Sequence, residues 1–85
     1  MEKFTLNICD SNGTVDVWRE SDNIESLKLT AFETISRHLP RLEEGEFIQA
    51  CIMRSCDLQN RAKYIPQVWS IEATNQVTRN RFWAV

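Results

Sequence analysis

Three cysteines and one histidine are the residues of this chain that could bind a metal ion or act as nucleophiles: Cys9, Cys51, Cys56 and His38. Three thiolates and an imidazole would complete a tetrahedral zinc site. Structural zinc usually takes its ligands in pairs about two to four residues apart on tight turns, whereas Cys51 falls in a predicted strand and Cys9 and His38 stand alone. We therefore expect reduced thiols without a metal, and Cys9, at a turn, as the most reactive of the three.

Patterns typical of catalysis are missing from the sequence. The only glycines, Gly13 and Gly45, fall in predicted turns, and there is no glycine-rich phosphate loop, no Gly-x-Ser-x-Gly and no His-Glu-x-x-His. The acidic residues at positions 43, 44 and 46 surround a turn, as solvated surface charges do. His38 falls in the last turn of a predicted helix, where an imidazolium interacts favourably with the helix carboxyl end. We expect no enzymatic activity, no catalytic residue and no cofactor.

Tryptophan and arginine are the remaining residues with binding chemistry, because they bury a large area while keeping a polar group accessible. Three tryptophans are many for a chain of 85 residues. The strand alternation described below predicts one surface that gathers candidate partner-binding residues: Trp18, Phe47, Met53, Arg79, Arg81 and Trp83. The alternative is that these aromatic side chains only pack against neighbouring strands or a loop.

The first elements are predicted to form a β-hairpin. Residues 3–9 alternate between apolar and polar side chains, residues 10–13 contain an Asn-Gly turn, and residues 14–19 alternate again. A loop of two or four residues would place Trp18 on the same face as Thr5. The opposite face would then carry the apolar set Leu6, Ile8, Val15 and Val17.

A helix is predicted to follow the hairpin. Asp22, with Glu25 three residues later, resembles a capping box, Ser21 is an alternative cap, and Pro40 ends the helix. Phe32 belongs to the predicted apolar stripe, so its truncation to alanine is expected to cost about 3–5 kcal/mol. The stripe comprises Ile24, Leu27, Ala31, Phe32, Ile35 and Leu39.

Residues 46–55 form a predicted strand with two apolar faces, which is typical of a central strand. Phe47, Cys51 and Met53 alternate with Ile48, Ala50 and Ile52. Residues 57–63 are polar and are predicted to form an exposed loop.

A second hairpin is predicted from residues 68–73 and 78–85, joined around residues 74–76. If its loop has an even number of residues, Trp69 and Ile71 share a face with Phe82 and Ala84. The other face then holds Val68, Arg79, Arg81 and Trp83.

These elements predict a single α+β domain over residues 1–85, a small sandwich of one helix on an antiparallel sheet in the order β-β-α-β-β-β. With 42% apolar and 26% charged residues the chain should fold. We find no signal peptide and no stretch that could span a bilayer, so we expect a cytoplasmic protein.

The helix is predicted to cover one sheet face and to leave the other open for binding. We expect a non-catalytic module that binds a protein partner, or a second copy of itself as a homodimer, through this face. It would act as an inhibitor, adaptor or regulator by covering a surface, as small bacterial or phage proteins often do. No membrane is expected as a partner.

The alternative function is binding of single-stranded RNA or DNA on the same face. Aromatic side chains would stack on bases while basic side chains contact phosphate. The candidate residues are Arg61, Lys63, Arg79, Arg81 and Trp83. The net charge of −2 and the acidic first half of the chain count against this alternative, because most phosphate-binding proteins carry a basic excess.

Overall fold

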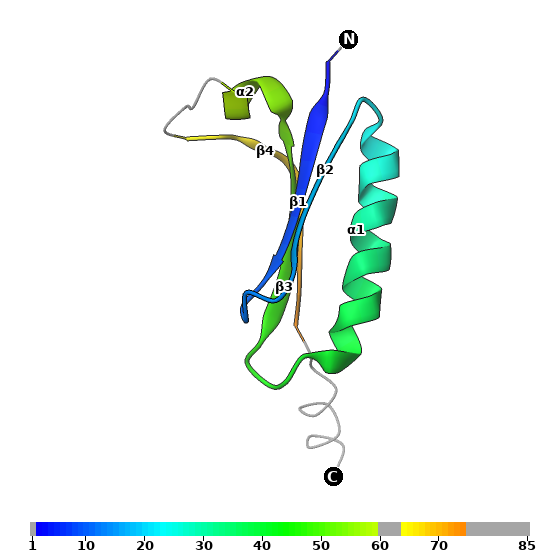
Figure 1. Ribbon diagram of the computed structural model, residues 1–85, viewed down its shortest axis with the longest axis vertical. Coiled ribbons are helices and arrows are strands. Elements are labelled where there is room, and N and C mark those ends of the chain that lie inside the picture. Colours follow the sequence, from blue (N-terminus) through cyan, green and yellow to red (C-terminus); the bar gives the residue numbers. More distant parts are fainter. Residues whose placement is uncertain (1, 60–63, 75–85) are drawn as a thin grey trace.

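The computed structural model describes residues 2–59 and 64–74 of the chain. They form an α+β unit in which one long helix packs on a four-stranded antiparallel sheet of order β2-β1-β3-β4 (Figure 1). The elements are β1 (Phe4–Asp10), β2 (Asp16–Ser21), α1 (Ile24–His38), a 3-10 turn η1 (Leu39–Arg41), β3 (Phe47–Arg54), α2 (Ser55–Gln59) and β4 (Gln67–Thr74). The α+β class is confirmed, while the predicted strand 78–85 lies outside the described residues. No described helix has the length and apolar character needed to cross a bilayer.

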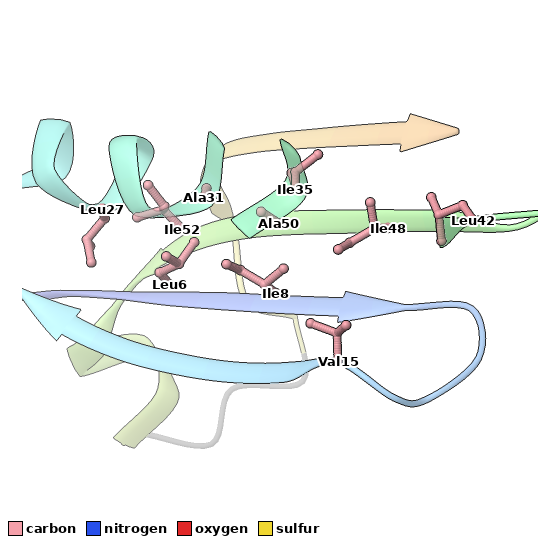
Figure 2. Packing of buried hydrophobic residues seen from close by; sticks show 10 residues of the cluster. All are labelled: Leu6, Ile8, Val15, Leu27, Ala31, Ile35, Leu42, Ile48, Ala50 and Ile52. Atoms are coloured by element: carbon pink, nitrogen blue, oxygen red, sulfur yellow. The ribbon is translucent and has the colours of Figure 1, made fainter. Parts of the chain in front are cut away.

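The core lies between α1 and the central strands β1 and β3. Leu6 stands opposite Ile52, and Ile8 stands opposite Ala50, so four apolar side chains meet beneath the helix. Figure 2 shows this packing from close by. The helix contributes Leu27, Ala31 and Ile35, and the fully packed cluster also contains Val15, Leu42 and Ile48. The predicted alternation of β1 and β3 is therefore confirmed, with the isoleucine face of β3 turned toward the helix.

The loop between β1 and β2 is held by the carboxylate of Asp10. Its oxygens accept hydrogen bonds from the Thr14 amide at 2.9 Å, the Thr14 hydroxyl at 2.6 Å and the Val15 amide at 3.0 Å. Because Cys9 pairs with Asp16, the connection is longer than the predicted two or four residues. The number of intervening residues stays even, so the predicted faces of the hairpin are unchanged. Gly13 adopts a φ of 71°, which favours glycine.

The helix start differs from the prediction. Asn23 is the N-cap, and its side-chain oxygen accepts a hydrogen bond from the Ser26 amide at 3.2 Å. The hydroxyl of Ser21 accepts from the Asn23 amide at 3.0 Å and so supports the cap from the preceding turn. The predicted cap, Asp22, lies one residue before the cap that the structure shows. The helix ends at His38, just before Pro40 in η1, as predicted.

Phe32 is not a core residue, contrary to the prediction from the apolar stripe. Its side chain is 46% exposed and meets the ring of Trp69 edge-on, with centroids 5.7 Å apart. Phe32 lies one residue further around the helix than Ala31, which is fully buried against the sheet. The stripe therefore includes the flank of α1 as well as its buried face. Thr34 is buried in addition to the predicted residues.

A short second helix replaces the start of the predicted loop 57–63. α2 continues directly from β3 and lies on the opposite side of the sheet from α1 (Figure 1). The Ser55 amide donates to the Lys3 carbonyl at 3.0 Å, and the Ser55 and Thr5 hydroxyls share a hydrogen bond of 2.7 Å. These bonds fix the start of α2 to β1 and to the residue before it.

The opposite end of the β1–β3 pair is also fixed by a serine. The Ser11 amide donates to the Phe47 carbonyl at 2.9 Å, and the Ser11 hydroxyl accepts from the Phe47 amide at 3.0 Å. The loop after β1 is thus joined by two hydrogen bonds to the first residue of β3.

Two leucines on α1 provide a matched test of the core. Leu27 is 3% exposed and Leu29 is 63% exposed. We predict that Leu27→Ala lowers the free energy of unfolding by about 2–4 kcal/mol, because it leaves a cavity beneath the helix. Leu29→Ala should change it by less than about 0.5 kcal/mol. Urea denaturation followed by circular dichroism measures both values, and equal losses would contradict the packing described here.

The Asp10 loop should make stability depend on pH. Hydrogen bonds, above all from the Thr14 hydroxyl, hold the pKa of Asp10 below its usual value of 3.8. Because the folded-state pKa is lowered, this stabilisation is complete above the pKa of the unfolded chain and is lost as the pH falls through the folded-state pKa. We predict that Asp10→Asn lowers the melting temperature at neutral pH and that the difference from the native chain shrinks in strong acid. A difference that does not change with pH would refute this.

Candidate interaction face

The sheet surface opposite α1 is the candidate binding surface and is called the open face below. Strand register places its side chains in cross-strand rows, of which the central one runs through Trp18, Asn7, Cys51 and Ser70. The flanking rows are Glu20, Thr5, Met53 and Gln67 on one side and Asp16, Cys9, Gln49 and Glu72 on the other. The apolar side chains among the paired residues of this face are Trp18, Met53 and, at the start of β3, Phe47. The other paired residues are polar or cysteine.

Trp18 is the largest exposed side chain of the open face, with 52% of its surface accessible. It lies on β2, an edge strand of the described sheet, directly opposite Asn7. The Asn7 amide group donates to the Asp16 carboxylate at 3.4 Å and to the Val17 carbonyl at 3.3 Å. These bonds orient the Asn7 side chain toward β2. The residue across from the indole is therefore small and polar, and it offers no apolar surface.

The described part of the open face is acidic. Asp16 and Glu20 precede and follow Trp18 by two residues and therefore share its side of β2, and Glu72 adds a third carboxylate on β4. Two cations lie near this part of the sheet. The Arg19 guanidinium donates to the Trp18 carbonyl at 2.9 Å. The Lys3 ammonium group lies 3.9 Å from Glu20, with both side chains largely in solvent. Such an exposed pair is weak. The three carboxylates of the described open face favour cationic groups over phosphate, although the Arg19 guanidinium at the β2 edge offsets part of their charge.

The predicted partner-binding residues have different positions in the structure. Trp18 is exposed on the open face, and Phe47 is half-buried at the start of β3. Met53 is only 8% exposed, at the end of the open face where α2 packs against β3. It is therefore not accessible to a partner in this structure. Arg79, Arg81 and Trp83 lie outside the described residues, as do the nucleic-acid candidates Arg61 and Lys63.

Trp69 lies on the helix side of the sheet, as the alternation of β4 predicts. It packs beside the core, contacts Phe32, and has the Lys28 ammonium group 5.8 Å from its ring centroid. Sequence patterns did not predict that α1 leaves this side of β4 partly exposed, because helix placement over the sheet depends on tertiary packing.

The three thiols differ in exposure. Cys9 and Cys51 lie half-buried on the open face, where the Gln49 amide group donates to the Cys9 sulfur at 3.4 Å, and Cys56 on α2 is exposed. Burial raises the pKa of the Cys51 thiol, and the neighbouring Cys9 raises it further. Within residues 2–59 and 64–74, no three histidine, cysteine or acidic side chains come together as a metal site would require.

Comparison with known proteins adds no functional assignment. No family model, no curated protein and no solved structure matches the chain.

Thiol alkylation tests the exposure of the open face. The sequence favours Cys9 as the most reactive thiol, but Cys9 is half-buried and Cys56 is exposed. We therefore predict that iodoacetamide modifies Cys56 first. Cys51 should react last, because burial limits access to its sulfur and its raised pKa lowers the fraction of the reactive thiolate. Peptide mass spectrometry over a time course gives the three rates. If Cys51 reacted as fast as Cys56 in the folded protein, Cys51 would be more accessible than described.

Proposed function

We propose that this chain is a non-catalytic interaction module that binds a protein partner through the open face, with Trp18 as the anchor. The partner surface is basic, and the module regulates that partner by covering it. The observation that carries the proposal is a half-exposed indole on a sheet face whose described neighbours are small, polar or acidic.

Exposure of Trp18 supports binding because a large aromatic side chain gains more from burial in an interface than from contact with water. Neither Asn7 opposite it nor the flanking Asp16 and Glu20 supplies an apolar surface against which the indole could pack. A partner pocket would bury the ring and exclude water around it.

The carboxylates beside Trp18 support a basic partner. An arginine or lysine placed over the indole would gain a cation–π interaction, and Asp16 or Glu20 could accept its hydrogen bonds. The Lys3–Glu20 pair, with its charged atoms 3.9 Å apart, is weak. Its replacement by a contact between Glu20 and a cation of the partner would therefore cost little free energy. Electrostatic attraction of this kind also speeds association.

Nucleic-acid binding remains the alternative, and it depends on Arg61, Lys63, Arg79, Arg81 and Trp83. All five lie outside the described residues. The described part of the face carries more carboxylates than cations, which opposes contact with phosphate. We therefore favour a protein partner.

Affinity capture from extract of the native cell tests this proposal. We predict that the native chain retains a basic protein, that nuclease treatment does not release it, and that Trp18→Ala weakens its binding by about tenfold or more. Leu29→Ala is the matched control, because it removes an exposed apolar side chain from α1, away from the open face. Circular dichroism should show that both variants remain folded.

The contrary outcomes are distinct. If the Trp18→Ala variant bound the protein as tightly as the native chain does, Trp18 would not be the anchor. Release of the ligand by nuclease, together with a steep loss of binding as salt rises, would favour the nucleic-acid alternative.

A further inference from the structure

The open face is hollowed between β3 and β4. Strand register sets two small residues, Cys51 and Ser70, opposite each other. Because residues two apart on a strand point to the same side, longer side chains flank this small pair on both sides and leave a depression between them. The depression is a cavity of about 190 Å³. The flanking pairs are Gln49 with Glu72 and Met53 with Gln67.

Polar side chains line this cavity around Cys51. Gln49, Gln67, Ser70 and Glu72 all border it, and all four are exposed. Each carries an oxygen that accepts hydrogen bonds. Among the described residues that line the cavity, Glu72 is the only charged one. The cavity therefore favours a group that donates hydrogen bonds and carries positive charge.

The carboxylate of Glu72 is available to such a group. Within residues 2–59 and 64–74, the ion pairs use the carboxylates of Glu2, Glu20 and Glu25, and none uses Glu72. A cation that bound here would not have to displace an existing salt bridge in this part of the chain.

The size of the cavity indicates what kind of group it holds. Sites for small molecules usually enclose about 300–1,000 Å³, so this cavity suits one side chain of a protein partner better than a cofactor. A guanidinium offers five N–H donors in one plane and binds a carboxylate through two of them, whereas an ammonium group acts as a point charge. The neutral oxygens beside Glu72 could accept the remaining donors, which favours arginine over lysine.

We infer that the protein partner places an arginine side chain in this cavity, with its guanidinium bound to Glu72. The inference rests on the proposed function, because it adds a second contact to the same open face. Trp18 lies on β2 in the same cross-strand row as Cys51 and Ser70, and the cavity lies between β3 and β4. With strands about 4.8 Å apart, the indole and the arginine contact are separated by about 12 Å.

Disulfide exchange at Cys51 tests the charge preference of the cavity without a partner. Guanidinoethyl disulfide, cystamine and dithiodipropionate attach a guanidinium, an ammonium or a carboxylate group to the sulfur. For each reagent, the exchange constant of Cys51 in the native chain is divided by that in Glu72→Gln, so that the intrinsic reactivity of the reagent cancels. Peptide mass spectrometry after acid quenching measures the labelled fractions, and circular dichroism checks that the variant is folded.

We predict that, at low salt, Glu72→Gln lowers labelling of Cys51 by the guanidinium reagent about threefold or more, lowers labelling by the ammonium reagent less, and raises labelling by the carboxylate reagent. Glu33→Gln is the matched control, because it removes an exposed carboxylate from α1, on the other side of the sheet. It should leave all three constants unchanged.

Equal responses of the guanidinium and carboxylate reagents to Glu72→Gln would overturn the inference, because Glu72 would then not set the charge preference of the cavity. Equal responses of the guanidinium and ammonium reagents would overturn the choice of arginine. If no reagent labelled Cys51 in the folded chain, the cavity would be closed to side chains and the inference would also fail.

Capture from cell extract separates this inference from the proposed function. We expect Glu72→Gln to weaken binding of the retained protein by about fivefold, and Glu33→Gln to leave it unchanged. Binding that is lost with Trp18→Ala but unaffected by Glu72→Gln would overturn the arginine contact and leave the proposed function standing. If the native chain retained no protein, the proposed function itself would fail, whatever the reagents show at Cys51.

Discussion

The packing of α1 on the β1–β3 pair is the contact on which the remaining structure depends. Leu27, Ala31 and Ile35 meet the apolar side chains of the two central strands, and the small side chain of Ala31 lets the helix approach the sheet closely. Because the helix occupies only one side, the opposite side of the same strands faces solvent. Because it lies over β1 and β3, the strand β4 is covered only in part. The open face and the partial exposure of β4 follow from this one placement.

Sequence patterns predicted the elements whose periodicity is strong. The alternation of β1 gives the core residues Leu6 and Ile8, and the alternation of β3 separates Ile48 and Ile52 from Cys51. Because the period of a strand is two, the faces stayed correct even though the first loop is longer than predicted. The helix bounds were nearly correct because a polar cap and a proline limit it on either side.

Tertiary contacts decided the features that the sequence did not predict. Phe32 satisfies the helical spacing, yet it lies on the flank because Ala31 and Ile35 define the centre of the buried face. Met53 alternates with core residues and was expected on the surface, but α2 follows β3 and packs at that end of the sheet. No periodicity predicts so short a helix. For the candidate site, the sequence predicted that Trp18 lies on the face away from the helix. It did not predict which carboxylates share that face, because their positions depend on the strand register.

The serine contacts at the two ends of the β1–β3 pair determine where the fold can loosen. Ser11 binds the first residue of β3, and Ser55, just beyond its end, binds both Thr5 and the Lys3 carbonyl. Strand pairs normally fray from their ends, and here hydrogen bonds close both ends, from the loop after β1 at one end and from α2 at the other. Local opening should therefore begin at the outer strands and reach the centre only on global unfolding. Conformational adaptability is thus concentrated at the two margins of the described sheet, one of which is β2 with Trp18.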